Sequence, residues 1–245
     1  MPKPAHILAK PGDIAKIVVT SGDPERTEQI ARMLDKPKLV NKNRGFTTYT
    51  GSYNGVRLTV AAHGIGGPSA SVVYEELKML GAKVIVRFGT AGGLIDDLAV
   101  GEFVVPVGAA YLDGSLRSYV QDGVLPPVPD FVITANIIRA CAAARVSFTT
   151  GLVFSSDAFY EQDPKFLAGW TKRGVIAVEM ECATLFTLAY LRGFRAASLL
   201  LLSNSLVRKG EKALATAEKL KPYVERGGIL LLEALTNEAV TSLAQ

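Results

Sequence analysis

The stretch that decides the fold is Val84-Ile85-Val86-Arg87-Phe88-Gly89-Thr90-Ala91-Gly92-Gly93. Its first half is rich in β-branched and aromatic residues, which is typical of a strand buried on both faces. Its second half is rich in glycine, which predicts a tight turn directly after that strand. The N–H groups of glycines can approach an anion closely, and Arg87 can hold two oxygens of a phosphate. A plain turn with Arg87 in a surface ion pair also fits, because the stretch is neither a Walker A nor a dinucleotide fingerprint.

Apolar runs alternate with amphipathic segments on both sides of this stretch. We expect strands near residues 16–20, 46–53, 56–62, 102–111, 149–154, 174–180 and 196–203, and helices near 24–34, 68–80, 131–144, 164–172, 182–192 and 225–243. The Asn54-Gly55 pair predicts a hairpin between two of these strands. The sequence therefore predicts an α/β fold: a single-domain three-layer α/β/α sandwich around a mixed central β-sheet, with one domain over residues 1–245.

The composition excludes several classes of protein. The chain has 245 residues, is 49% hydrophobic and 20% charged, and carries a net charge of +4 from dispersed basic residues, which disfavours a nucleic-acid partner. No apolar run reaches the ~18 residues that a membrane span needs, and no apolar signal segment follows Met1-Pro2-Lys3-Pro4. With only Cys141, Cys182, His6 and His63, we expect neither a disulfide framework nor a metal site. We therefore expect a cytoplasmic protein without a membrane partner.

Two carboxylates stand close together in Val178-Glu179-Met180-Glu181-Cys182-Ala183, just after an apolar strand. Buried acids are costly unless they meet hydroxyls, cations or amides. If the segment is extended, Glu179 and Glu181 share a face, and a carboxylate can accept from two adjacent sugar hydroxyls. The segment therefore fits a sugar site. A solvated pair of glutamates that opens a helix fits equally well from this segment alone.

Further motifs add to this picture. Gly22-Asp23-Pro24-Glu25-Arg26 is a second glycine turn with an arginine, although a plain Asp-Pro turn explains it as well. Phe159-Tyr160 offers aromatic faces for a base or sugar, although aromatic residues more often fill a core. Two such turns could hold a phosphate dianion opposite sugar-binding acids. Together they suggest an enzyme that brings inorganic phosphate to a sugar.

In this order, the motifs resemble the nucleoside phosphorylase family, which includes purine nucleoside, uridine and methylthioadenosine phosphorylases. The motifs are Gly22-Asp23-Pro24-x-Arg26, His63-Gly64-Ile65-Gly66, Arg87-Phe88-Gly89-Thr90-x-Gly92, Phe159-Tyr160 and Glu179-Met180-Glu181. The resemblance covers the chain from His6 to about Lys209 and a C-terminal helix. It implies the phosphorylase/hydrolase-like fold and phosphorolysis, in which phosphate attacks C1′ of a nucleoside and releases the base with ribose 1-phosphate.

The resemblance also implies a role for individual residues. Phosphate would be bound by Gly22, Arg26, Arg44, Arg87, Gly89 and Thr90, ribose by His6, Ile65, Met180 and Glu181, and the base by Phe159, Glu179, Ser203 and Asn204. Arg87 and Asn204 would carry the catalysis. His6 and Arg44 would complete the site of a neighbouring subunit, so the resemblance implies a homodimer and a hexamer built from three such dimers. No cofactor or metal is implied, and inorganic phosphate is a co-substrate.

The residues that would determine base specificity depart from the family pattern. Purine members of the bacterial hexameric type carry Ser-Asp where this chain has Ser203-Asn204. An amide has no titratable proton but can donate a hydrogen bond, so we expect 6-oxopurine nucleosides to be cleaved better than adenosine. Uridine phosphorylases carry a Gln-x-Arg clamp at the positions of Asp163 and Lys165, which makes uridine the alternative.

Other substrates and protein classes stay open at this stage. The sequence does not decide whether methylthioadenosine is accepted. A hydrolytic nucleosidase or a non-catalytic nucleoside-binding protein would share much of the pattern. The presence of Arg26, Arg44 and Arg87 together favours a phosphate-dependent enzyme over both, because a hydrolase has little use for three arginines.

Overall fold

The computed structural model describes residues 3–112, 114–121, 123–160 and 163–245. Its strands are β1 (Ile17–Ser21), β2 (Asp35–Asn41), β3 (Thr48–Tyr53), β4 (Val56–Ala62), β5 (Val84–Gly93), β6 (Phe103–Tyr111), β7 (Phe148–Ser155), β8 (Val175–Glu179) and β9 (Arg195–Ser205). Its α-helices are α1 (Pro24–Ala31), α2 (Gly67–Met79), α3 (Gly114–Tyr119), α4 (Phe131–Ala143), α5 (Pro164–Thr171), α6 (Cys182–Arg192), α7 (Ala217–Leu235) and α8 (Glu238–Thr241).

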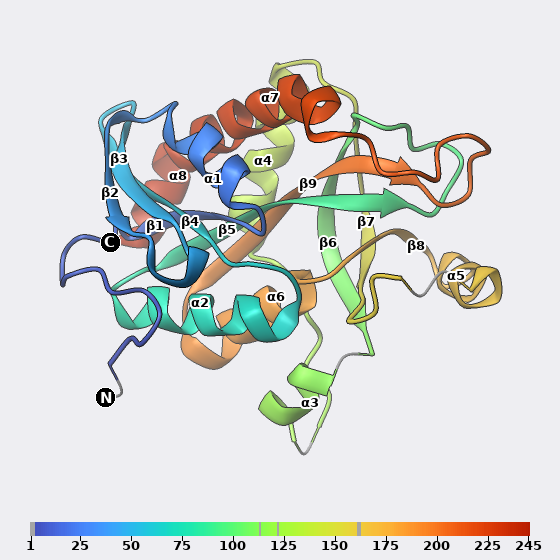
Figure 1. The fold of residues 1–245 in the computed structure, drawn as a ribbon, viewed down its shortest axis with the longest axis horizontal. Helices are drawn as coiled ribbons and strands as arrows, with labels where there is room; N and C mark the ends of the chain where they lie inside the picture. Colours follow the sequence, from blue (N-terminus) through green and yellow to red (C-terminus); the bar gives the residue numbers. More distant parts are fainter. Residues whose placement is uncertain (1–2, 113, 122, 161–162) are drawn as a thin grey trace.

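The described strands form one mixed nine-stranded sheet in the order β2-β3-β4-β1-β5-β8-β7-β6-β9. Helices α2 and α6 cover one face, and α1, α4 and α7 cover the other (Figure 1). Alternate residues of β5 point to the two layers, so that Val86 and Phe88 pack with α7 while Ile85 packs with α2. The predicted single-domain α/β sandwich with a mixed sheet is confirmed. By the same alternation, Arg87 points to the layer of α2 and α6.

The glycine-rich half of β5 differs from the prediction. Residues Gly89–Gly93 continue the strand, and the predicted tight turn after Phe88 is wrong. Gly92 pairs with Val178 of β8 on one side and with Asn204 of β9 on the other. Because β9 also pairs with β6, the sheet folds back on itself from β5 through β8, β7, β6 and β9 to β5. Glycine allows this close approach of β5 to β9, since a Cβ on Gly92 would lie 3.2 Å from Oδ1 of Asn204.

Several element boundaries also differ from the predictions. Strand β2 was not predicted, because its exposed Asp-Lys-Pro-Lys start has the composition of a loop, and it pairs on one side only, with β3. Helix α7 begins at Ala217 rather than near residue 225 and contains Pro222, which masked its start. Thr216 caps it by accepting from the N–H of Lys219. Among the described residues, no helix combines the length and the apolar character needed to cross a bilayer.

The packing of α7 on the sheet gives a stability prediction. Ala normally stabilises a helix interior by ~1 kcal/mol relative to Gly. At Gly227, however, a new Cβ would overlap the Phe88 ring and lie 2.9 Å from Cε1 of Phe103. We expect Gly227→Ala to lower the free energy of unfolding by about 1–3 kcal/mol in urea titrations, because the two rings are buried and cannot move away.

Gly228→Ala is the matched control in the same helix. Its Cβ would meet the flexible Met33 side chain at 3.0 Å, so we expect it to stay within ~1 kcal/mol of the unmodified protein. Equal stability of the two variants would contradict the proposed packing of α7 against Phe88.

Candidate active site

Three segments meet where strands β1, β4 and β5 run side by side. Thr20 of β1 lies in register with Arg87 of β5, and Ser21 lies in register with Ala62 of β4. The turn after β1 therefore lies against the loop after β4. A Cβ on Gly22 would be 2.9 Å from the carbonyl oxygen of Gly64, so glycine is required for this approach. Ligands of α/β sheets bind at such carboxyl ends of parallel strands.

A buried ion pair between Arg87 and Glu181 lies at this junction. Nη2 of Arg87 donates to Oε2 of Glu181 and lies 3.5 Å from Oε2 of Glu179. The N–H of Gly66 donates to Oε1 of Glu181 at 2.7 Å. Within the described chain, Nε and Nη1 of Arg87 have no hydrogen-bond partner. Burial alone would lower the pKa of Arg87, but the two carboxylates raise it, and the net effect is a raised pKa. The guanidinium therefore stays charged, with two nitrogens available to an anion.

The two glutamates have different surroundings. They do open a helix, but each is only 4% exposed, which rules out the solvated pair that the sequence left open. Glu179 accepts from the N–H groups of Glu181 at 2.8 Å and Cys182 at 3.0 Å, and from the hydroxyl of Ser155. Burial raises the pKa of Glu179. Burial acts on Glu181 in the same direction, but Arg87, His63 and the N–H of Gly66 together outweigh it and lower the pKa of Glu181. Glu179 therefore anchors the start of α6.

A second cation lies beside the Gly22 turn. Asp23 caps α1 by accepting from the N–H of Glu25 at 2.8 Å, which places Arg26 in the first turn of that helix. The Arg26 guanidinium lies over the Phe88 ring, 5.9 Å from its centroid, with Nη1 3.5 Å from the hydroxyl oxygen of Ser21. Burial and the charge of Arg87 lower the pKa of Arg26. The junction thus holds two partly desolvated arginines, which is a setting that favours a dianion.

The remaining phosphate and ribose candidates lie close by in the chain. Gly89 packs directly under the Arg87 side chain, and a Cβ at this position would overlap the guanidinium. Thr90, which follows it, is half-buried. Met180 is half-buried between the two glutamates, whereas Ile65 is 74% exposed on the loop after β4.

The candidate base residues lie beside Gly92. Nδ2 of Asn204 donates to the carbonyl of Lys212 at 3.1 Å, and the hydroxyl of Ser203 donates to Oδ1 of Asn204 at 3.3 Å. Phe159 is 48% exposed, so it does not fill the core, which was the alternative explanation for this residue. These contacts leave the second N–H of Asn204 available to a ligand.

A cleft of about 700 Å³ opens close to these residues. Leu94, Leu167 and Leu206 form its apolar part, and the charged lining residues are Asp96, Asp97, Lys172 and Lys212. Leu206 lies 3.4 Å from the position of a Cβ on Gly92, so the cleft begins where β5 and β9 meet. Its size fits a small organic molecule.

His6 and Arg44 belong to neighbouring segments and, within the described residues, make no polar contact with the ion pair. Nδ1 of His6 is 2.8 Å from Oε1 of Glu76, and the side chain of Asn43 donates to the His6 carbonyl at 3.0 Å. Arg44 is exposed and has a left-handed φ of 54°. Among the described residues, no hydrogen bond or ion pair joins either side chain to Arg87. In one chain, therefore, these two side chains are not bonded to the ion pair.

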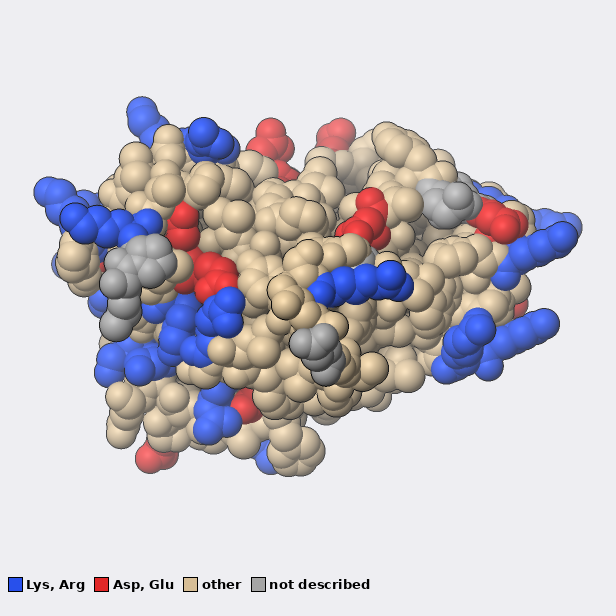
Figure 2. Space-filling view, turned by 90° about the horizontal axis from the view of Figure 1, so that it is seen from below, with Lys and Arg blue, Asp and Glu red and all other residues tan. Residues whose placement is uncertain are grey.

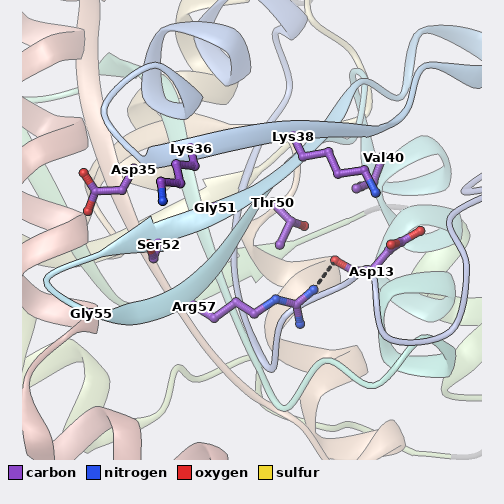
Figure 3. Close-up of a pocket in the computed structure, with 10 residues that line it drawn as sticks. All are labelled: Asp13, Asp35, Lys36, Lys38, Val40, Thr50, Gly51, Ser52, Gly55 and Arg57. Carbon is purple, nitrogen blue, oxygen red and sulfur yellow. Dashed lines mark hydrogen bonds between the residues drawn. The ribbon is translucent and has the colours of Figure 1, made fainter.

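Another cavity, of about 380 Å³, lies at the far end of the hairpin (Figure 3). It is lined by residues of β2, β3 and the start of β4, whereas the ion pair lies beyond the end of β4. Its Arg57 donates to the carbonyls of Gly12 at 2.6 Å and Asp13 at 2.8 Å. This cation is already engaged by the backbone, so the cavity is not the candidate active site.

Neither the charges on one face of the molecule nor the metal-ligating side chains of the described residues mark a further site. On the face shown in Figure 2, the described Lys and Arg side chains lie mostly toward the periphery and do not form a continuous track. No group of three or more His, Cys, Asp or Glu side chains that could hold a metal ion occurs in the described residues.

Three residues at or beside the ion pair were given no individual role from the sequence. The N–H of Gly66 donates to Glu181, the hydroxyl of Ser155 donates to Glu179, and His63 lies buried beside Gly22. For Gly66 and His63 the available signal was their place in a glycine-rich motif, and the φ of 85° at Gly66 shows why glycine is needed there. Nothing local in the sequence marks Ser155, because its contact joins β7 to β8.

Comparisons with known proteins agree with this geometry. The sequence model described as the Phosphorylase superfamily matches residues 16–236. The chain is 35% identical over 240 residues to a guanosine phosphorylase of Halorubrum lacusprofundi, covering 96% of this chain and 99% of that protein. It is 33% identical to a uridine phosphorylase of Thermococcus kodakarensis, covering 90% and 86%. A purine nucleoside phosphorylase of Toxoplasma gondii, solved with immucillin-H, superposes with a TM-score of 0.88 at 27% identity, covering 98% of both chains. The chain belongs to the phosphorylase superfamily, and within it to the nucleoside phosphorylases, which are pentosyltransferases.

Proposed function

We propose that this enzyme is a purine nucleoside phosphorylase that cleaves 6-oxopurine nucleosides with inorganic phosphate. The observation that carries the proposal is the buried pair of Arg87 and Glu181, in which a cation with unpartnered nitrogens adjoins an ionised carboxylate. The cation suits the attacking phosphate, and the carboxylate suits the ribose hydroxyls. A site for water alone would not require the second buried arginine, Arg26.

In the proposed complex, phosphate binds between Arg87 and Arg26 with help from the backbone of Gly22 and Gly89 and the hydroxyl of Thr90. Ribose lies against Glu181, Met180 and Ile65. As the glycosidic bond breaks, the ribosyl group becomes cation-like, and the adjacent phosphate stabilises that charge while it is already positioned for attack. Phosphate is a co-substrate, and we propose no other cofactor and no metal.

The leaving base gathers negative charge, and we propose that Asn204 stabilises this charge with a hydrogen bond. A 6-oxopurine can place this charge on O6, where the free N–H of Asn204 can donate a hydrogen bond. Ser203 orients the amide, and Phe159 stacks beside the base. The bonds that Glu179 makes to the start of α6 fit a supporting role better than direct contact with the base.

Uridine remains the second candidate, since a relative of similar identity is a uridine phosphorylase. Asp163 falls at one clamp position of those enzymes, and here it caps α5 by accepting from the N–H of Lys165 at 3.0 Å. A residue engaged in this way is poorly placed to hold uracil. The guanosine phosphorylase relative favours a purine.

Assembly is also part of the proposal. We infer that His6 and Arg44 reach the site of a partner subunit, because Arg44 is exposed and neither side chain has a polar contact with Arg87 in the described part of its own chain. The minimal active unit would be a dimer, and three dimers would form a hexamer. We further propose that residues 1–245 act as one domain in the cytoplasm, where Cys141 and Cys182 remain free thiols.

The first prediction concerns the substrate. In a panel of inosine, guanosine, adenosine, methylthioadenosine and uridine, we expect base release only with phosphate, and kcat/KM at least ~10-fold higher for inosine and guanosine than for adenosine. Phosphate-independent release would indicate a hydrolase. Adenosine cleavage as efficient as inosine cleavage would contradict the role of Asn204.

As a reciprocal variant, Asn204→Asp should raise the ratio of adenosine to inosine activity, because an acid can protonate the base.

The second prediction concerns the phosphate cradle, the name we give to the proposed phosphate-binding residues Gly22, Arg26, Arg87, Gly89 and Thr90. Gly89→Ala would force the Arg87 guanidinium out of its place against Glu181. We expect KM for phosphate to rise ~10-fold or more, since a displaced bidentate cation loses charge-assisted hydrogen bonds. Gly114→Ala is a control, because a Cβ there meets nothing within 4 Å and the backbone is not in the left-handed region. A phosphate KM unchanged by Gly89→Ala would contradict the assignment.

The third prediction concerns the shared site. Arg44→Ala and Glu181→Ala should each be nearly inactive. A mixed dimer has one complete site, made of the Glu181 of one subunit and the Arg44 of the other. Refolding equal amounts of both variants together should therefore restore about a quarter of the original activity, since half of the dimers are mixed and each has one of two sites. No restoration in confirmed mixed dimers would show that Arg44 serves its own subunit.

A further inference from the structure

His63 is a buried residue of the junction to which the proposed mechanism gives no role. It directly follows β4, and its N–H donates to the carbonyl of Ser21 at 2.8 Å, which fixes it beside the Gly22 turn. Its side chain is fully buried, with Cε1 3.5 Å from the position of a Cβ on Gly22. The ring packs on Tyr74, with 5.5 Å between centroids. The imidazole edge that carries nitrogen therefore faces the turn that is proposed to hold phosphate.

The ring nitrogens of His63 have capacity for a ligand. Neither makes a hydrogen bond of good geometry within the described residues, and the nearby Gly64 carbonyl lies outside that geometry. The titratable groups around the ring are Glu181, Arg87, Arg26 and Tyr74. Burial, aided by the two arginines and opposed by Glu181, lowers the pKa of His63 to about 4. A neutral imidazole has one nitrogen that can only accept a hydrogen bond.

A hydrogen-bond acceptor at the position of His63 changes which anions the phosphate cradle can distinguish. Arg26, Arg87 and the N–H groups of the glycines can only donate hydrogen bonds, and a set of donors holds sulfate and phosphate alike. The Thr90 hydroxyl can rotate to donate to either anion, so it does not distinguish them. Near neutral pH, the phosphate dianion still carries one P–OH group, whereas sulfate carries none. The oxygens of Glu181 already accept from Arg87 and Gly66.

We propose that His63 accepts a hydrogen bond from the P–OH group of bound phosphate and so makes the site select phosphate over sulfate. The inference rests on the proposed phosphorolysis. It adds a specificity residue for the anion, separate from the residues that bind the nucleoside.

The test compares phosphate and sulfate in the intact enzyme. We expect His63→Phe, which keeps the ring volume but removes the acceptor, to raise KM for phosphate about tenfold, the effect of one lost buried hydrogen bond. The inhibition constant of sulfate against phosphate should change less than about twofold, because sulfate donates nothing to His63. Asn and Gln carry an acceptor near the positions of Nδ1 and Nε2, so either His63→Asn or His63→Gln should recover part of the phosphate affinity.

Equal losses for phosphate and sulfate in His63→Phe would overturn the proposal and leave phosphorolysis intact, since the cradle itself would then be distorted. If His63→Phe does not fold, calorimetry on the unmodified enzyme decides. Phosphate should bind at least about tenfold more tightly than sulfate at pH 7.5, and equal affinities would overturn the assignment. Absence of phosphate-dependent turnover in the unmodified enzyme would instead contradict the proposed function, whatever the calorimetry shows about His63.

Discussion

The buried ion pair between Arg87 and Glu181 is the interaction on which the rest of the site depends. Removing two charges from water is costly, and the cost is offset only if both partners and their remaining hydrogen-bonding groups are satisfied. Glu181 meets this condition through Gly66 and Arg87, whereas Arg87 keeps nitrogens without a partner in the described chain. An incomplete arrangement of this kind is a reason to expect an anion there, because a bound dianion completes what the protein leaves open.

This pair also joins parts of the chain that are distant in sequence. Arg87 comes from β5, Glu181 precedes α6, and Gly66 precedes α2. Glu179 adds a further link, since its bonds to Ser155, Glu181 and Cys182 fasten β7 and β8 to the start of α6. Breaking a buried pair by removing one partner typically costs about 3–5 kcal/mol, so the same contacts serve folding and binding. Variants at Glu179 will therefore report on stability before they report on chemistry.

Local patterns were enough to predict the layers of the fold. Apolar runs predicted most of the strands, and the motifs around Gly22, Arg87 and Glu181 lie in segments that the structure brings together. What could not be predicted depends on contacts between distant segments. The continuation of β5 through Gly93 requires β8 and β9 on either side, and glycines without that context indicate a turn. His63 appeared only as part of a motif, because its burial beside Gly22 arises from the register of β1 with β4.

Choice of base depends on more than one residue at position 204. The carbonyl of Lys212 can only accept, so it fixes which end of the Asn204 amide faces it, and the hydroxyl of Ser203 satisfies the other end. A carboxylate at this position would place an acceptor against the Lys212 carbonyl and would disturb the segment after β9. That segment contributes Leu206 and Lys212 to the lining of the cleft. A single change to an acid can therefore shift the relative activity toward adenosine, but full activity with that acid requires a different path for this segment, so that the chemistry of the leaving group and the shape of the base pocket must change together.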